Sequence, residues 1–229
     1  MTKAADKIIV ALDVATGKET VGLVGELRGQ ISLFKIGLQL YMAEGPEIVR
    51  AVLAEGVKVF LDLKLHDIPN TVVGAVKSAA DLGVQMLTIH LSGGSEMIQA
   101  AIAARKDHMS ILGVTVLTSA DEATLRETGI SDTIDKQVLR LARLGVANGI
   151  DGVVTSPREI KMLRAEFGDK IKIVAPGIRP AWSQAGDQRR VMTPQQAIEA
   201  GADYLVIGRP ITLHPNPCEA VGLILSELV

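Results

Sequence analysis

The sequence has one cysteine, few aromatic residues and almost no net charge, and each shortage excludes a class of protein. Cys218 has no partner for an intrachain disulfide. Aromatic residues make up 3% of the 229 residues and the formal net charge is −2, so the chain lacks the stacking platforms and the basic surface of a nucleic-acid binder. No apolar run approaches the ~20 residues that cross a bilayer, and the first residues do not resemble a signal peptide. We therefore expect a cytoplasmic protein that binds neither nucleic acid nor membrane.

Two further patterns are missing. No pair among the histidines has a metal-ligand spacing such as His-x-x-x-His, so we predict no zinc site. The turn after the first predicted strand lacks the Gly-x-Gly-x-x-Gly pattern of dinucleotide-binding folds. We expect neither a metal nor an organic cofactor.

The sequence does contain eight short apolar segments, each followed by a segment with helical character. The predicted strands are 8–13, 32–37, 57–64, 86–91, 110–117, 152–154, 171–175 and 204–208. The predicted helices are 19–27, 46–55, 68–82, 97–105, 135–147, 157–166, 194–200 and 217–228. The strand segments are continuously apolar, as parallel strands covered on both faces are. This alternation predicts an α/β fold, a (β/α)8 TIM barrel, with residues 1–229 as a single domain.

The segment Asp62–Thr71, at the end of the third predicted strand, has the most unusual composition. Side chains alternate along a strand, so Phe60, Asp62 and Lys64 share one face. Asp67 follows, and Pro69 suits the first turn of a helix. Buried charges are costly unless paired, so this cluster is either a salt bridge that lines the barrel or a catalytic charge network.

Polar residues collect where the other predicted strands end. In a (β/α)8 barrel these ends form the active site. They carry Asp13, Lys35, Asp62, Lys64, Thr118, Arg179 and Arg209, with Asp67 and Gln188 on adjacent loops. The segment Gly208-Arg209 follows the last strand, where such barrels commonly bind phosphate, and the polar loop 180–191 could close over it.

These segments together resemble the orotidine 5′-phosphate decarboxylase family, most closely its bacterial branch. The matching motifs are Ala-Leu-Asp13, Phe-Lys35-Ile-Gly, Asp62-Leu-Lys64-Leu-His-Asp67-Ile-Pro-Asn-Thr71, Leu-Thr118-Ser, Pro-Gly-Ile-Arg179, Gly-Asp-Gln188-Arg-Arg and Ile-Gly208-Arg209-Pro. They occur in the family's order from Ile8 onward. The Asp-x-Lys-x-x-Asp core alone is shared with a wider group of barrels, whereas Lys35 and the Gly-Asp-Gln-Arg-Arg loop are specific.

The resemblance implies a cofactor-free decarboxylation of orotidine 5′-monophosphate to uridine 5′-monophosphate by a homodimer with shared active sites. It implies that Lys64 stabilises and protonates the C6 carbanion within an array of Lys35, Asp62, Lys64 and Asp67. In the implied substrate site, Asp13 and Lys35 hold the ribose, and Thr118 contacts the pyrimidine. The residues around the phosphate are Gln188, Gly208, Arg209 and Arg179. The resemblance also implies that each chain inserts three residues into its partner's site: Asp67, Ile68 and Thr71.

Two other functions remain open from the residues alone. One is a magnesium-dependent sugar-phosphate decarboxylase, aldolase or epimerase on the same barrel, although Lys35 puts a cation where a metal site needs an acid. The other is a non-catalytic protein that binds a phosphorylated ligand. Binding alone gives no reason for the Asp-Lys-Asp cluster.

Overall fold

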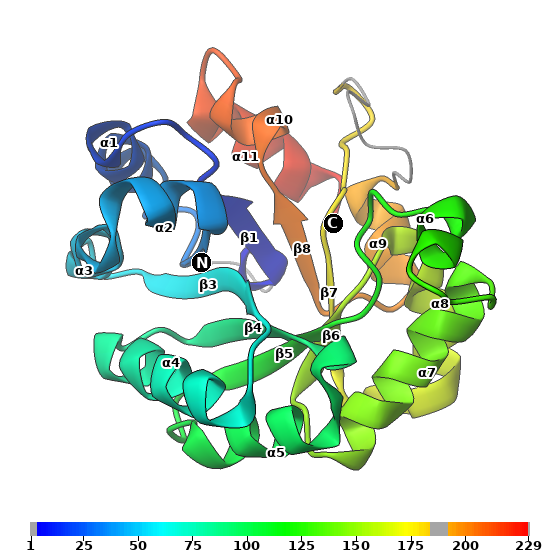
Figure 1. The fold of residues 1–229 in the computed structure, drawn as a ribbon. Coiled ribbons are helices and arrows are strands. Elements are labelled where there is room, and N and C mark those ends of the chain that lie inside the picture. Colours follow the sequence, from blue (N-terminus) through cyan, green and yellow to red (C-terminus); the bar gives the residue numbers. More distant parts are fainter. Residues whose placement is uncertain (1–3, 184–191, 229) are drawn as a thin grey trace.

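Eight parallel strands form a closed barrel in the order β1 to β8, with β8 paired to β1. A computed structural model describes residues 4–183 and 192–228 (Figure 1). The strands are β1 (Ile8–Ala11), β2 (Leu33–Gly37), β3 (Lys58–Leu65), β4 (Met86–His90), β5 (Ser110–Val114), β6 (Gly152–Val154), β7 (Lys172–Ala175) and β8 (Tyr204–Ile207). The predicted (β/α)8 barrel is confirmed.

Helices surround the strands on the outside (Figure 1). They are α1 (Gly17–Leu27), α2 (Leu38–Glu44), α3 (Pro46–Ala54), α4 (Pro69–Leu82), α5 (Gly94–Ala104), α6 (Glu122–Glu127), α7 (Ile134–Ala147), α8 (Ile160–Phe167), α9 (Pro194–Glu199), α10 (Arg209–Thr212) and α11 (Pro217–Ser226). Short 3-10 turns lie at Ala5–Lys7, Leu91–Gly93, Pro157–Glu159 and Gly168–Lys170. The chain therefore returns from each strand to the next through at least one helix.

Local sequence signals set where several helices begin and end. Pro69 occupies the first turn of α4, where a missing N–H costs nothing, and Gly83 ends that helix in the left-handed conformation at φ 88°. The side chains of Thr16 and Thr133 accept backbone N–H groups at the starts of α1 and α7. Such caps explain why the predicted boundaries of the longer helices lie close to the observed ones.

Some sequence-based predictions are wrong in detail. The helices α2, α6 and α10 are not predicted, because seven, six and four residues are too few to show a helical apolar repeat. The helix predicted at 97–105 begins earlier, at Gly94. The strand predicted at 110–117 ends at Val114, because Val114 pairs with the last residues of both neighbouring strands, His90 and Val154.

Apolar side chains form two layers, one inside the barrel and one between the strands and the helices. The inner layer contains Ile9, Ala11, Leu33, Phe60, Met86, Leu112, Val174 and Val206. Residues that alternate with them, such as Ile8 and Val10, face the helices. The inner layer fills the barrel below the C-terminal ends of the strands, so polar side chains at those ends lie on an apolar floor.

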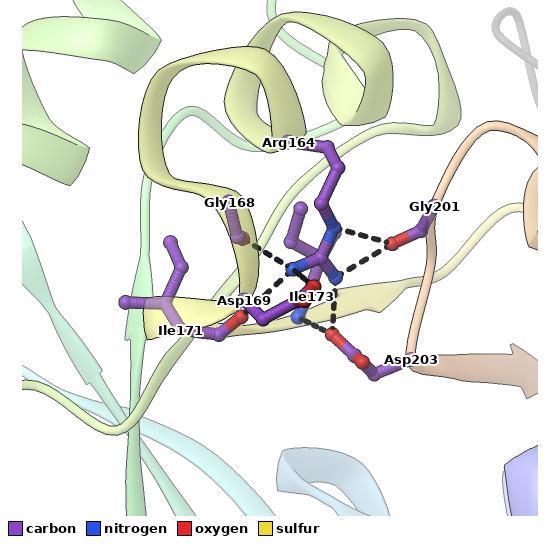
Figure 2. Close-up of polar contacts among 7 residues, drawn as sticks. All are labelled: Arg164, Gly168, Asp169, Ile171, Ile173, Gly201 and Asp203. Carbon is purple, nitrogen blue, oxygen red and sulfur yellow. Dashed lines mark hydrogen bonds and ion pairs between the residues drawn. The ribbon is translucent and has the colours of Figure 1, made fainter.

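An arginine clamp ties β7 and β8 together at the opposite end of the barrel (Figure 2). The Arg164 guanidinium donates to the Gly201 carbonyl at 3.0 and 2.7 Å, to the Ile171 carbonyl at 3.3 Å and to Asp203 Oδ2 at 2.6 Å. The same carboxylate oxygen accepts the Ile173 N–H at 2.7 Å. The clamp holds the starts of two strands whose other ends lead into the Arg179 and Arg209 segments.

Candidate active site

A cavity of about 290 Å³ opens at the C-terminal ends of the strands. It is lined by eight residues predicted from the sequence: Asp13, Lys35, Asp62, Lys64, Thr118, Arg179, Gly208 and Arg209. Its walls also include residues that were not predicted from the sequence, among them Val114, Val116, Val154, Thr155 and Val206. Thr155 directly follows β6, so the same strand-end rule could have found it.

Four charged side chains form an alternating series across the cavity. Lys35 Nζ lies 3.2 Å from Asp13 Oδ1 and 3.6 Å from Asp62 Oδ2. Asp62 Oδ2 also accepts a hydrogen bond from Lys64 Nζ at 2.9 Å. Each cation thus has a carboxylate beside it, which is the arrangement that allows charges to stay ionised away from bulk water.

Asp62 is the most enclosed acid of the series, with 11% of its side chain exposed. Burial acts to raise the pKa of its carboxyl, but the ammonium groups of Lys35 and Lys64 and the hydrogen bonds from Lys64 and Thr88 outweigh burial and hold the pKa below its usual value. Asp62 is therefore a carboxylate at neutral pH. Lys64, with 35% of its side chain exposed, reaches from this carboxylate into the open part of the cavity.

The backbone of Lys64 is unusual. Among the residues that the structure describes, it is the one non-glycine residue with positive φ, at 53°. The left-handed conformation brings Cβ close to the next carbonyl and is rare for a lysine. Its backbone N–H donates to the Thr88 hydroxyl of the neighbouring strand at 2.8 Å. The predicted shared face of Phe60, Asp62 and Lys64 is confirmed, because all three line the cavity.

Gly37, at the end of β2, leaves room for the Lys35 ammonium. A Cβ added at this position would lie 2.9 Å from Lys35 Nζ and 3.1 Å from Asp13 Oδ1. Any larger residue would therefore press on the salt bridge between them. Gly37 belongs to the motif Phe-Lys35-Ile-Gly, but the sequence does not reveal its contact with Lys35, because the contact depends on the path of the lysine side chain.

The Arg179 and Arg209 side chains line the same cavity and also share a neighbouring hollow at its edge. Arg209 begins α10 directly after Gly208, where a Cβ would lie 3.3 Å from that of Ala11. Arg179 follows β7, and its backbone N–H donates to the Met192 carbonyl at 3.0 Å. Two guanidinium groups at one edge of a cavity can bind a phosphate. Gln188, predicted for the same phosphate, lies outside the described residues.

Three predicted site residues do not line this cavity. Asp67 and Ile68 lie in a shallow hollow beyond the end of β3, together with His66, Pro69, Ser92 and Gly93. Asp67 Oδ1 accepts the N–H of Ile68 at 2.6 Å, and the Ile68 residue is 66% exposed. Thr71 is exposed on the first turn of α4. Within one chain, the acid at position 67 is thus separated from the charged series.

The part of the chain that the structure describes has neither a metal-binding cluster nor a membrane-spanning helix. Within 4–183 and 192–228, no three or more His, Cys, Asp or Glu side chains gather in a way that could hold a metal ion. None of the helices in these ranges has the length and apolar character that a membrane crossing requires.

Comparison with known proteins agrees with the geometry. The family model described as "Orotidine 5'-phosphate decarboxylase / HUMPS family" matches residues 6–224. An orotidine 5′-phosphate decarboxylase of Moorella thermoacetica is 50% identical over 234 residues, which cover 98% of this chain and 93% of the relative. One of Idiomarina loihiensis is 49% identical over 229 residues, covering 98% and 99%.

The fold agrees as well. The crystal structure of orotidine 5′-phosphate decarboxylase from Lactobacillus acidophilus matches with a TM-score of 0.85 at 36% identity, covering 97% of this chain and 99% of that one. From the family model and the full-length relatives, this chain belongs to the orotidine 5′-phosphate decarboxylase / HUMPS family.

Proposed function

We propose that this protein decarboxylates orotidine 5′-monophosphate to uridine 5′-monophosphate, the step that completes uridine 5′-monophosphate synthesis. The observation that supports this most directly is the alternating series Asp13, Lys35, Asp62 and Lys64 inside a cavity with two arginines at its edge. Relatives at 44–50% identity over nearly the whole chain carry the decarboxylase name.

The cavity suggests how the substrate is oriented. Arg209, Arg179 and the backbone of Gly208 bind the phosphate, with Gln188 as a fourth contact. Asp13 and Lys35, whose side chains meet at 3.2 Å, bind the ribose hydroxyls. Thr118, across the cavity, hydrogen-bonds the pyrimidine. This orientation directs C6 of the pyrimidine towards Lys64.

Lys64 supplies the chemistry. The bond between C6 and the carboxylate breaks, CO2 leaves, and the electron pair stays on C6, where no adjacent orbital can delocalise it. A fixed ammonium aimed at that carbon stabilises the developing charge. Lys64 then transfers one of its protons to C6, which gives the product, and regains a proton from solvent.

Asp62 keeps Lys64 ready for this step. Its carboxylate lies 2.9 Å from the Lys64 ammonium and holds that ammonium in place at the edge of the cavity. Lys35 lies on the other side of Asp62, so the carboxylate is shared between two ammonium groups. Lys64 is therefore held in place without forming a closed ion pair with a single carboxylate.

We propose further that each site is shared between two chains of a homodimer. Asp67 lies outside the cavity of its own chain, and the neighbouring Ile68 exposes a large apolar side chain. Leu38 and Met42 on α2, which follows the adjacent strand β2, are also exposed. An apolar surface beside an acid fits a second copy of this chain, which would receive Asp67, Ile68 and Thr71 in its site.

Turnover tests the activity directly. The purified protein, mixed with orotidine 5′-monophosphate, should change the ultraviolet absorbance as the pyrimidine loses its carboxylate, and activity should survive exhaustive chelation. Activity that disappears with EDTA and returns with Mg2+ would favour a metal-dependent sugar-phosphate enzyme. Binding of the nucleotide without turnover would favour a non-catalytic binding protein.

Complementation tests the shared site. Lys64→Ala and Asp67→Ala homodimers should each be nearly inactive. In a mixed dimer, one site carries both substitutions and the other has native residues at both positions, so random pairing should restore about a quarter of wild-type activity. If mixed dimers form and restore nothing, Asp67 acts within its own chain and the shared site is wrong.

Two broader assignments accompany this function. The strands share one closed barrel, which supports residues 1–229 as one domain. Cys218 is a free thiol in a chain with no other cysteine, which supports a cytoplasmic location.

A further inference from the structure

Thr88 lies in the middle of β4 and is fully buried, with 0% of the residue exposed. Met86, two residues away and on the same face of the strand, belongs to the apolar inner layer, so packing alone would accept a valine here. A buried hydroxyl needs hydrogen-bond partners. Thr88 itself is not among the residues that line the cavity, so any effect on the reaction must pass through those partners.

The Thr88 hydroxyl connects two residues of the charged series. It accepts the backbone N–H of Lys64 at 2.8 Å and donates to Asp62 Oδ1 at 3.0 Å. The other oxygen of the same carboxylate, Oδ2, faces Lys64 Nζ at 2.9 Å. One hydroxyl therefore contacts both the backbone of the lysine and the carboxylate that holds its ammonium.

The position of Thr88 in the sheet explains why a side chain is needed. β3 pairs with β4 in register at Leu61 and Leu87, and pairing resumes at Leu65 and Ile89. Between these pairs Thr88 is the single β4 residue, opposite three residues of β3. This register shift is a β-bulge in β3, and it leaves the Lys64 N–H outside the regular hydrogen-bond ladder between the two strands. The Thr88 hydroxyl accepts this N–H in place of a backbone carbonyl.

We propose that Thr88 is a positioning residue for the decarboxylation. It holds Lys64 in the left-handed conformation that points the ammonium into the cavity, and it holds the Asp62 carboxylate against that ammonium. Because a preorganised charge stabilises a transition state better than a mobile one, loss of the hydroxyl should slow the chemical step more than it weakens binding. The effect on turnover rests on the proposed function of Lys64.

Substitution separates positioning from packing. Thr88→Val removes the hydroxyl with little change in volume, and Thr88→Ser keeps the hydroxyl but loses a methyl group. Because a hydrogen bond to a charged group is involved, kcat in Thr88→Val should fall on the order of tenfold to hundredfold. Thr88→Ser should recover most of that loss. KM and the affinity for uridine 5′-monophosphate should stay within about twofold of wild type.

Thr20 provides a matched control. It is equally buried, in α1, and its hydroxyl donates to the Thr16 carbonyl at 2.9 Å without contacting the charged series. Thr20→Val also loses one buried hydrogen bond, so a general loss of stability should appear in both valine variants. Of these two variants, only Thr88→Val should have a lower kcat than wild type.

Three results would overturn the proposal: a Thr88→Val enzyme with wild-type kcat, an equal loss of kcat in Thr88→Ser, or an equal rise in KM and fall in kcat. If Thr88→Val does not fold, Thr88→Ala against Thr88→Ser makes the same comparison. If neither apolar variant folds while Thr88→Ser does, the hydroxyl is structural and the positioning role is wrong.

Turnover of the wild-type and Lys64→Ala proteins, measured in the same assay, distinguishes a failure of the proposed function from a failure of the role of Thr88 alone. No turnover by wild type, or full turnover by Lys64→Ala, refutes the proposed function and with it the role of Thr88. An active wild type and an inactive Lys64→Ala, together with an unaffected Thr88→Val, refute the role of Thr88 alone.

Discussion

The left-handed backbone of Lys64 predicts that this position is strained, and the strain can be measured. Glycine adopts positive φ without the steric cost that a Cβ brings, so Lys64→Gly should be more stable than Lys64→Ala. Both variants lose the ammonium and its contact with Asp62, so this loss cancels between them. The remaining difference in the free energy of unfolding between the two variants measures the cost of the left-handed backbone.

The magnitude follows from two opposing effects. Relief of the left-handed conformation favours glycine by ~1–2 kcal/mol. The greater freedom of glycine in the unfolded chain favours alanine by ~0.5–1 kcal/mol. The net preference for glycine at position 64, where φ is 53°, should lie within ~0–1.5 kcal/mol.

Lys58 provides the control in the same strand. It is an exposed lysine at the first residue of β3, with ordinary extended backbone. Lys58→Gly should therefore be less stable than Lys58→Ala by ~0.5–1 kcal/mol, the opposite sign. The double difference between the two positions isolates the cost of the left-handed conformation, ~1–2 kcal/mol.

Equilibrium unfolding in urea at one protein concentration measures all four variants, since association would otherwise shift the apparent stability. The thermal midpoint should move in the same direction, by roughly 2–4 °C per kcal/mol for a chain of this size. If glycine is less stable than alanine by the same amount at both positions, Lys64 is not held in a left-handed conformation and the reasoning is wrong.

Three further predictions concern the site and the barrel. Lys64→Ala should lose turnover by several orders of magnitude yet still bind product, whereas Arg209→Ala should chiefly raise KM; equal loss of product binding in both would contradict this division. The folded-state pKa of Asp62 is lowered from 3.8, so the stability that its carboxylate contributes is present above that value and is lost as the pH falls below it; Asp62→Asn should therefore flatten the fall in the free energy of unfolding below about pH 4 in unfolding titrations. Arg164→Ala should cost about 2–4 kcal/mol, because the Gly201 and Ile171 carbonyls and Asp203 lose a charged donor, while Arg143→Ala, which removes a surface ion pair, should leave the thermal midpoint unchanged.

The sequence was sufficient for the order of the strands and for most of the polar residues around the cavity. A strand end is a local feature, since it is marked by the change from an apolar run to a polar residue or a turn. The barrel rule then brings all such ends to one rim. Asp13, Lys35, Asp62, Lys64, Thr118 and Arg209 were found in this way, without knowledge of any distance between them.

Short helices and contacts across strands could not be predicted in the same way. α10 has four residues, fewer than the apolar repeat needs to appear. Thr88 sits inside a strand, and nothing local distinguishes it from a threonine that merely packs. Its importance depends on a neighbouring strand that bulges at the matching position.

The sequence by itself determined which side chains carry charge and which end of the barrel they occupy, because strand periodicity and strand ends are properties of contiguous residues. The tertiary structure decided how those charges are held. The bulge opposite Thr88, the positive φ of Lys64 and the close approach of Gly37 to Lys35 all depend on residues brought together from different strands. Pairing between strands is non-local, so the contacts that aim Lys64 exist only once the barrel has closed.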